Sequence, residues 1–370
     1  MNWKKELANN ITTVDELEKA LQKEFSKEEK EKLNEIVKQY PLSIPHYYLS
    51  LIDKDDENDP IRKLCIPSTK ETDLTGSFDT SGESNNTVVV GLQHKYKQTG
   101  LLLSTNQCGM YCRHCFRKRL VGLNSDEIMN HLKEIIAYIK EHDEINNVLI
   151  SGGDAFLNNN RIIHSYLEDL SSIEHLDLIR FGTRTPVTFP MRINGDQELL
   201  NILREYSRKK KIYVVTHFNH PNEITKESIK AVKNLLNSEV VLKNQTVLLK
   251  GVNDNPDVLA TLINKLTAIG INPYYIFQCR PVSGVKNQFQ LPLKEGYHIV
   301  EKTKSKLNGH GKCFRYVMSN KRGKIEILGN LSDTTMLFKF HEAKYDKDMG
   351  KIFQLDIKDE QCWIEEASIK

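Results

Sequence analysis

Short apolar runs alternate with amphipathic stretches over about residues 100–308. Six of the runs have the length and apolar content of buried strands, and they lie at 101–105, 147–151, 178–183, 212–217, 240–249 and 274–278. Apolar residues at helical spacing predict helices near 125–141, 160–172, 196–208, 225–237, 256–269 and 294–308. Six strand-helix units in succession predict an α/β fold with a parallel sheet and helices outside it. Because six units are too few to close an eight-stranded barrel, we expect an open, partial parallel β/α barrel.

The first part of the chain has a different pattern, rich in Lys, Glu and Leu at helical spacing. Thr13, followed three residues later by Glu16, fits a capping box at the start of one helix. A second helix is expected to end before Pro41, because proline cannot continue a helix. Residues 1–58 are therefore predicted to form a helical N-terminal region.

The other boundaries follow from turn residues and from the loss of periodicity. Residues 59–99 are rich in turn-forming residues and have little periodicity, so we expect a connector that wraps the core rather than folding alone. The core is expected over 100–308. Residues 309–370 are expected to form a short C-terminal extension that ends in a charged tail.

The composition favours a globular protein that handles a small ligand. The chain has 370 residues, of which 39% are hydrophobic, enough for a sizeable core. Its 52 basic and 49 acidic residues nearly cancel and form no long block of one sign, so a nucleic-acid or membrane-surface role has little electrostatic basis. The start lacks an apolar leader, and no apolar run has the length of a membrane span, so we expect a cytoplasmic protein.

Three of the seven cysteines follow the first predicted strand at C-x-x-x-C-x-x-C spacing: Cys108, Cys112 and Cys115. Three thiolates at this spacing can hold one face of an iron–sulfur cube and leave one iron open to a small molecule. A zinc site is disfavoured because it needs a fourth ligand, and His114 lies between two of the cysteines, where its ring could hardly reach the same ion. A disulfide is disfavoured because a cytosolic chain keeps its thiols reduced.

Other candidate groups lie at the ends of the predicted strands, where parallel α/β sheets place their chemistry. The segment Gly152-Gly153-Asp154 offers bare backbone and one carboxylate for the ammonium group of a cofactor; alternatively, it is only a tight turn. His217, with Asn219 and His220, is expected to line the same cleft, the alternative being structural histidines.

Cations lie beside the cysteine motif, namely Arg113, Arg117, Lys118 and Arg119. A guanidinium can bind a carboxylate with two hydrogen bonds, so we expect at least one of them to bind a substrate or a phosphate. The alternative is a solvated basic turn. Lys324, after Gly323, lies in an ordinary surface hairpin or forms an imine with a cofactor, and spacing alone does not decide between them.

Five stretches resemble the lysine 2,3-aminomutase family of radical S-adenosylmethionine (SAM) enzymes. They are in the family's order over about residues 55–350 and lie at 108–119, 151–155, 217–223, 247–254 and 323–324. The resemblance implies that Cys108, Cys112 and Cys115 hold a four-iron four-sulfur (4Fe-4S) cluster whose open iron chelates SAM. It implies that the residues lining the SAM pocket include Gly152, Gly153, Asp154, His217 and Gln245.

The resemblance also implies pyridoxal 5′-phosphate (PLP) as a cofactor, because Lys324 matches the lysine that forms an internal aldimine with it. Arg117 matches the arginine that holds the substrate α-carboxylate. In the implied reaction, a 5′-deoxyadenosyl radical takes a hydrogen from the β-carbon of an amino acid, and the amino group migrates from the α-carbon to the β-carbon. The implied partners are an amino acid, a reductase, flavodoxin or ferredoxin as electron donor, and further copies of the chain in a homo-oligomer; neither nucleic acid nor a membrane is expected.

The chain departs from the family's lysine-specific members at the expected substrate side-chain site. In those members, two aspartates hold the distal ammonium of lysine. An alignment by spacing places Arg280 and Val317 at these two positions. Because a cation repels that ammonium, we expect a substrate with an acidic or neutral polar side chain, as in glutamate 2,3-aminomutases. Alternatively, Arg280 turns away to bind the PLP phosphate or an internal carboxylate.

Two further departures concern the cofactors. The glycine-rich run that precedes the aldimine lysine is here Ser319-Asn320-Lys321-Arg322-Gly323, and Cys362 stands without the other cysteines of a C-terminal zinc site, so that zinc is expected to be absent. Two other functions stay open. One is a radical SAM enzyme on this scaffold that acts on another small substrate without PLP. The other is a non-catalytic iron–sulfur carrier, which the open iron disfavours.

Overall fold

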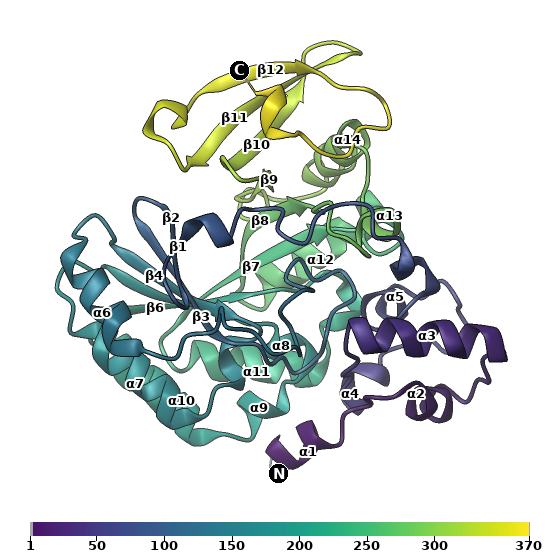
Figure 1. Ribbon diagram of the computed structural model, residues 1–370, viewed down its shortest axis with the longest axis horizontal. Coiled ribbons are helices and arrows are strands. Elements are labelled where there is room, and N and C mark those ends of the chain that lie inside the picture. The colour runs from purple at the N-terminus through teal and green to yellow at the C-terminus, as the bar shows by residue number, and fades with distance from the viewer. Residues whose placement is uncertain (1–2, 370) are drawn as a thin grey trace.

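The computed structural model describes residues 3–369, and its centre is one twelve-stranded sheet whose strands lie in chain order (Figure 1). All neighbouring strands from β3 to β9 are parallel. These strands are β3 (Thr99–Thr105), β4 (Asn147–Gly152), β5 (Leu178–Gly182), β6 (Lys211–Thr216), β7 (Val241–Leu248), β8 (Asn272–Gln278) and β9 (Arg315–Ser319). The six predicted strands are confirmed, and β9 adds a seventh parallel strand that the pattern did not predict.

Helices connect the parallel strands and cover the outer face of the sheet (Figure 1). They are α6 (Leu132–Glu141), α7 (Asn160–Ser171), α8 (Thr185–Thr188), α9 (Met191–Asn194), α10 (Gln197–Ser207), α11 (Lys226–Leu236), α12 (Pro256–Ala268), α13 (Lys286–Phe289) and α14 (Leu293–Lys304). Asn159 and Asp196 begin α7 and α10 by accepting backbone N–H bonds at the N-cap. The sheet does not close, because β3 pairs on its other side with β2 and β9 pairs with β10. The open, partial barrel is confirmed.

Strand β7 illustrates how this sheet makes room for a site. Burial alternates along it, so that Leu242 and Leu248 are buried in the main core while Gln245 and Val247 are partly exposed on the inner face. In a closed barrel, inward side chains from every strand fill the interior. Because this sheet stays open, its inner face borders a cavity.

The region before the core is helical, as predicted. Its helices are α1 (Trp3–Ala8), α2 (Val14–Leu21), α3 (Lys27–Gln39), α4 (His46–Leu49) and, within the predicted connector, α5 (Pro60–Cys65). Thr13 and Glu16 form the expected capping box, and α3 ends before Pro41. Helices α2 and α3 share a small core of their own around Val14 and Leu33.

The connector holds more structure than its pattern predicts. It contains β1 (Thr87–Val89) and β2 (Leu92–Tyr96), and β2 pairs antiparallel with β3, which extends the sheet at that edge. Both strands are short, and β2 is largely polar, so neither has the apolar run on which the strand prediction rests. The division of the chain into four parts stays a prediction.

The helix expected over 125–141 begins only at Leu132. Upstream of it, the backbone N–H of Met129 donates to the carbonyl of Leu103 on β3 at 2.9 Å. Met129 also packs against Gly91, where an added Cβ would lie 2.5 Å from the Met129 Cα. This tertiary contact holds the segment outside a helix, which is why local spacing placed the boundary too early.

The C-terminal extension contains a set of antiparallel strands, which the sequence analysis did not predict. The strands are β10 (Gly323–Asn330), β11 (Thr335–Ala343) and β12 (Ile352–Asp356), and they continue the sheet from β9. On β11 the apolar residues Met336, Phe338 and Phe340 are buried and alternate with half-buried ones. A period of two is typical of a strand with one buried face. Polar and charged residues such as Lys339 and Glu342 interrupt the apolar run, so the pattern did not predict a strand.

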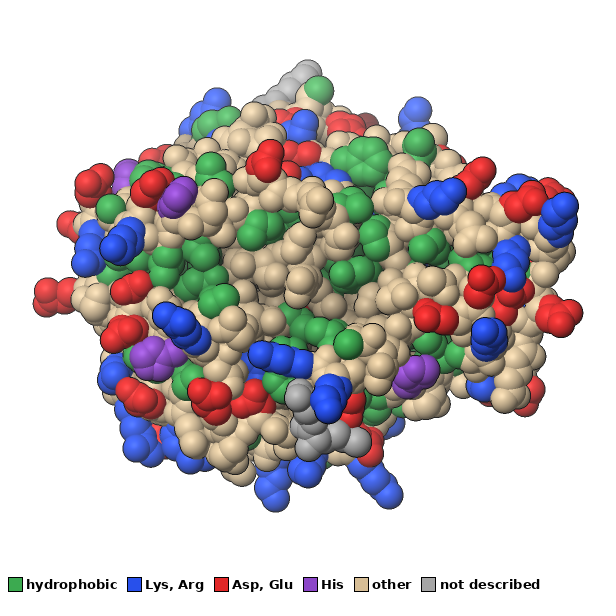
Figure 2. Space-filling view, turned by 60° about the horizontal axis from the view of Figure 1, so that its bottom comes forward, with side chains coloured by type: hydrophobic (Ala, Val, Ile, Leu, Met, Phe, Trp, Pro, Cys, Tyr) green, Lys and Arg blue, Asp and Glu red, His purple; other side chains and the backbone are tan. Residues whose placement is uncertain are grey.

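Acidic and basic side chains are mixed over the face shown in Figure 2, and apolar side chains and backbone occupy its middle. This face therefore presents no field of a single sign. Within residues 3–369, none of the helices combines the length and the apolar character needed to span a bilayer.

A buried group of charges fastens the connector to the segment after the cysteines. Glu71, at 0% exposure, accepts hydrogen bonds from Arg113 (Nε to Oε1, 2.9 Å) and Lys118 (Nζ to Oε2, 2.5 Å). Burial alone would raise the pKa of Glu71, but the two cations outweigh it and hold that pKa below its ordinary value. Arg113 and Lys118, two of the cations considered for substrate binding, are thus committed to Glu71.

Glu71→Gln should destabilise the protein by roughly 3–5 kcal/mol, because it leaves two buried cations without their counter-charge. Denaturant unfolding at pH 7 measures the loss. Because the Glu71 pKa is depressed in the fold, this stabilisation is present above the unfolded carboxyl pKa and is lost as pH falls through the folded value; the difference between wild type and variant should narrow in acid. Glu205→Gln, which breaks an exposed pair with Lys209, is the control and should leave the midpoint unchanged. Equal midpoints for both variants would contradict the role of Glu71.

Candidate active site

A cavity of about 340 Å³ opens on the inner face of the sheet. The site residues considered from the sequence line it, namely Cys108, Cys112, Cys115, Arg117, Gly152, Gly153, Asp154, His217, Gln245, Arg280 and Lys324. Val317 is not among the lining residues, because it is fully buried within β9. The fold therefore brings together groups that lie far apart in the sequence.

The direction of the strands accounts for this convergence. The cysteine loop follows the carboxyl end of β3, Gly152 ends β4, His217 follows β6, and Arg280 follows β8. Lys324 lies at the start of β10, which turns back antiparallel beside the carboxyl end of β9. All of these positions lie at one edge of the parallel sheet, where such folds place their sites.

The cysteine loop has the donors for a cluster rather than for a single ion. Within residues 3–369, the three thiols are not among the groups whose ligand atoms all converge to within 4.8 Å, as one zinc ion would require. A cube binds each thiolate to a different iron and accepts a wider spread. Burial raises the pKa of Cys115 to about 11 and that of Cys108 well above its ordinary value, so iron binding must displace their protons.

Arg184 stands at the end of β5, among the strand-end residues where the sequence places the chemistry, and it lies beside a cluster cysteine, a role that the sequence did not predict. Its Nη1 lies 2.6 Å from the Sγ of Cys112, and its Nη2 donates to Glu223 at 2.5 Å. Its Nε donates to the carbonyl of His217 at 3.1 Å. A fixed guanidinium beside a sulfur stabilises the thiolate form that a metal needs. No local spacing signals this contact, because it joins two separate strand ends.

The paired glycines at the end of β4 lie against the base of the cysteine loop. The N–H of Gly153 donates to the Thr105 carbonyl at 2.6 Å, and that of Asp154 donates to the Gln107 carbonyl at 2.7 Å. A Cβ at Gly152, where φ is +117°, would lie 2.3 Å from the Thr105 oxygen, and one at Gly153 would lie 2.3 Å from the Gln107 oxygen. Only glycine permits this approach, so the segment is a required tight turn as well as part of the cavity wall.

The Asp154 carboxylate is largely used within the protein. It accepts hydrogen bonds from Thr183 Oγ1 at 2.6 Å, from the Arg184 N–H at 2.8 Å and from the Phe156 N–H at 3.0 Å. Burial raises its pKa, and these hydrogen bonds oppose the rise. Asp154 therefore ties the end of β4 to the end of β5 and keeps little acceptor capacity for a cofactor ammonium.

Of the three polar residues after β6, His217 alone is in the cavity wall. Burial lowers the pKa of His217 to about 3, so its ring is neutral. Asn219 accepts a hydrogen bond from the N–H of Val247, and His220 caps a short turn by accepting from the N–H of Asn222. The expectation that all three line the cleft is thus corrected. The side chains of Asn219 and His220 instead accept hydrogen bonds from backbone N–H groups.

Two guanidinium groups in the cavity wall lie against one aromatic ring. The centre of the Phe116 ring lies 4.6 Å from the Arg117 guanidinium carbon and 4.3 Å from that of Arg280. Arg117 donates from Nε to Glu83 at 2.9 Å and from Nη1 to Ser151 at 3.1 Å. Arg280 Nη1 is buried and has no hydrogen-bond partner in the described chain. An unpartnered buried donor at a cavity wall is a site for an anion or another acceptor.

Lys324 lies among aromatic rings and opposite an acid. It pairs across β10 and β11 with Glu342 through a direct salt bridge. Its Nζ lies 4.5 Å from the ring centre of Tyr275 and 5.6 Å from that of Tyr96. Burial would raise the pKa of Glu342, but the Lys324 charge and hydrogen bond hold it below the ordinary value. Glu342 was not predicted, because its pairing depends on strand register.

Lys95 on β2 is a further cavity residue that the sequence analysis missed. Its Nζ donates to the carbonyls of Ser81 at 3.2 Å and Asn320 at 2.5 Å. Burial, together with the nearby charges of Arg280 and Lys324, lowers the Lys95 pKa to about 7. Because β2 was taken for irregular connector, its inward side chains could not be identified.

Comparisons with known proteins agree with this arrangement. A family model described as the Radical SAM superfamily matches residues 102–263. A putative L-lysine 2,3-aminomutase of Aquifex aeolicus is 40% identical over 345 residues, which cover 93% of this chain and 92% of that protein. The L-lysine 2,3-aminomutase of Clostridium subterminale is 40% identical over 84% of this chain and 73% of its own. The glutamate 2,3-aminomutase of Clostridioides difficile is 41% identical over 81% of this chain and 70% of its own.

The open parallel sheet and the three-cysteine loop are therefore those of a radical SAM enzyme. Within that class, the chain belongs to the lysine 2,3-aminomutase family, which includes the glutamate enzyme. It is accordingly an isomerase that acts on a small molecule, and its family implies a 4Fe-4S cluster and SAM. The cysteine loop has the donor set for that cluster.

Replacing any one of Cys108, Cys112 or Cys115 with Ala should abolish reductive SAM cleavage, because two thiolates leave a second iron exposed and the cube labile. Formation of 5′-deoxyadenosine under a chemical reductant measures the loss. Cys313→Ala, at an exposed thiol, is the control and should keep the parent's iron content and cleavage rate. Wild-type cleavage in a motif variant would refute the ligand assignment.

Proposed function

We propose that this enzyme is a PLP-dependent amino acid 2,3-aminomutase whose substrate has an acidic or neutral polar side chain. The observation that carries the proposal is the shared cavity, which the cluster cysteines, Arg117, Arg280 and Lys324 all line. Relatives named as lysine and glutamate 2,3-aminomutases, at 40% and 41% identity, support the reaction class. The amino group would move from the α-carbon to the β-carbon, and one hydrogen would move from the β-carbon to the α-carbon. The reaction is therefore an isomerisation that needs no external oxidant.

Support for PLP comes from the surroundings of Lys324. Its amine lines the cavity between the Tyr96 and Tyr275 rings, where an aromatic cofactor could be covered on its faces. Lys95 is a buried amine that donates to two carbonyl oxygens, and a bound phosphate would favour its protonated form. When bound, the cluster with SAM supplies a hydrogen-abstracting radical, and PLP supplies a carbonyl that holds the substrate nitrogen and delocalises an unpaired electron.

The chain's own side chains would bind and orient the substrate. Arg117 keeps Nη2 without a described partner after its bonds to Glu83 and Ser151, so it can donate to the substrate α-carboxylate. Glu83 also accepts from Arg119 at 2.8 Å and thereby fixes the direction of Arg117. Glu342 would hold Lys324 Nζ in the cavity through its salt bridge.

The substrate preference rests on the charges around Arg280. Arg117 and Lys95 line the same cavity as Arg280, whose buried Nη1 has no partner among the described residues. A substrate ammonium a few ångströms from Arg280 would be repelled by roughly 3–4 kcal/mol at an effective dielectric near 20. A side-chain carboxylate would instead gain charge-assisted hydrogen bonds. If Arg280 binds the phosphate of PLP, this preference does not arise, and the substrate assay below distinguishes the two cases.

We further propose that the enzyme takes its electron from a reductase, flavodoxin or ferredoxin, and that it works as a homo-oligomer, a dimer or tetramer. Electron delivery is required because reductive SAM cleavage consumes one electron. For the oligomer, light scattering at working concentration should give a mass of two or four chains. A mass of one chain would count against it.

Borohydride reduction of the PLP-treated enzyme should fix a pyridoxyl group on Lys324, because reduction makes an imine bond permanent. Peptide mass spectrometry locates the adduct. Lys324→Ala should lose it, whereas Lys312→Ala, at an exposed lysine, should keep it. A normal cluster spectrum without any adduct on Lys324 would exclude PLP attachment and favour a radical SAM enzyme that works without PLP.

Reduced enzyme with SAM and PLP should convert glutamate or a neutral polar amino acid to its β-isomer on the order of 100-fold faster than lysine, from the repulsion at Arg280. Chromatography of β-amino acids measures both rates. Arg280→Met should remove most of the discrimination, and Arg280→Asp should shift it toward lysine. Efficient conversion of lysine by the wild type, or unchanged selectivity in Arg280→Asp, would defeat the charge argument.

A further inference from the structure

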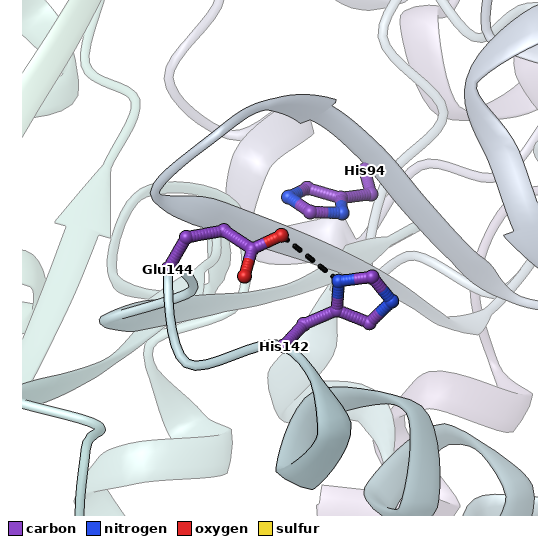
Figure 3. Close-up of side chains that lie close together, drawn as sticks. All are labelled: His94, His142 and Glu144. Atoms are coloured by element: carbon purple, nitrogen blue, oxygen red, sulfur yellow. Dashed lines mark hydrogen bonds and ion pairs between the residues drawn. The ribbon is translucent and has the colours of Figure 1, made fainter.

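A group of metal-ligating side chains lies outside the cavity, where β2 passes the end of α6. His94 belongs to β2, His142 follows α6 as its C-cap, and Glu144 lies two residues further on. One ligand atom from each of the three lies within 4.8 Å of the other two. Figure 3 shows the three side chains close together, His94 on a strand and His142 and Glu144 on the loop that follows a helix.

The hydrogen bonds of His94 fix its ring in a state suited to a ligand. Its Nε2 lies 3.0 Å from the carbonyl oxygen of Lys97, and because a carbonyl only accepts, Nε2 carries the proton. The Nδ1 lone pair accepts from the hydroxyl of Tyr138 at 3.0 Å, and a metal ion would bind Nδ1 by displacing that hydroxyl. A ring that donates one N–H to a backbone carbonyl and offers the other nitrogen is the arrangement found in metal-ligating histidines.

His142 and Glu144 supply an imidazole and a carboxylate that already face each other. The Nδ1 of His142 donates to Glu144 Oε1 at 2.9 Å (Figure 3). Their side chains are 34% and 35% exposed, so an ion can reach them from solvent. The Tyr138 ring stacks on His142 with centres 4.0 Å apart, and the His94 ring meets that of His142 edge-on at 5.7 Å. Packing therefore holds both imidazoles in place before any ion arrives.

We propose that His94, His142 and Glu144 form a binding site for a divalent transition-metal ion of the zinc class. Two imidazoles and one carboxylate are a donor set that suits Zn²⁺ and its first-row neighbours and disfavours Ca²⁺ and Mg²⁺, which take oxygen ligands. The ion would take the place of the proton between His142 Nδ1 and Glu144, and water would complete its coordination. The site shares no residue with the cysteine loop.

Such an ion would join an edge of the sheet to its covering helix. His94 is not among the residues that line the cavity, whereas its neighbour Lys95 is. A bond from His94 to the end of α6 would therefore hold β2, and with it the segment that positions Lys95. The ion would act as a structural clamp, with no part in the chemistry of the cavity.

The test is an anaerobic calorimetric titration of the cluster-loaded protein with ZnCl₂, so that the motif cysteines are already occupied by iron. The wild type should bind one Zn²⁺ and gain thermal stability on binding. His142→Gln and Glu144→Gln should each weaken binding by at least about 10-fold and lose that gain. His164→Gln is the matched control, because His164 faces Glu168 at 3.8 Å and Tyr206 at 3.2 Å but has no third ligand.

The control variant should bind as the wild type does. Circular dichroism of each variant without metal should match the wild type, since His142 and Glu144 are partly exposed. No saturable binding at tenfold excess of ZnCl₂, or equal affinity in Glu144→Gln and the wild type, would overturn the proposal.

Discussion

Strands β3 to β9 share one direction, and the positions of the cysteine loop, His217 and Arg280 in the cavity depend on it. In a parallel sheet, each strand begins at the same edge, so loops that follow different strands meet at the opposite edge. The cysteine loop, His217 and Arg280 come from three such loops. Closure of the sheet would fill its interior with side chains, and the open edge keeps that space as a cavity.

Direction alone does not set distances, and the finer placement comes from contacts between neighbouring strand ends. Gly152 and Gly153 let the end of β4 bond to the backbone below the cysteine loop, and Asp154 carries that fixation on to β5. Arg184 then reaches back from β5 to Cys112. The result is a continuous hydrogen-bonded edge that holds the cluster ligands relative to the rest of the cavity wall.

The charges of the cavity are arranged unevenly. Glu83 and Glu342 engage Arg117 and Lys324, while Arg280 keeps a buried donor without a partner in the described chain. Lys95 adds a buried amine that bonds only to carbonyl oxygens among its described hydrogen bonds and that an anion would protonate. Such an excess of positive charge suits ligands that carry carboxylate or phosphate, which is the chemistry of the proposed substrate and of PLP.

Part of the fold and of the candidate site could be predicted because local patterns in the sequence indicate it. The six strands and the cysteine motif are contiguous signals, and both were identified correctly. The antiparallel strands β1, β2 and β10 to β12 were missed because polar or charged residues interrupt their apolar periodicity. Arg184 and Glu342 were missed for another reason: their roles depend on which segments become neighbours, and a single sequence does not show strand register.

In the function proposed above, the radical source and the amino acid site share one cavity. The direct test is to follow deuterium from amino acids labelled at the β-carbon, glutamate and neutral polar ones included, in the reduced enzyme with SAM and PLP. If the account is right, deuterium from the accepted substrate appears in 5′-deoxyadenosine and at the α-carbon of the β-amino product. The shared cavity would be contradicted if the enzyme cleaves SAM in the presence of each labelled amino acid in turn, but no deuterium enters 5′-deoxyadenosine in any of these reactions.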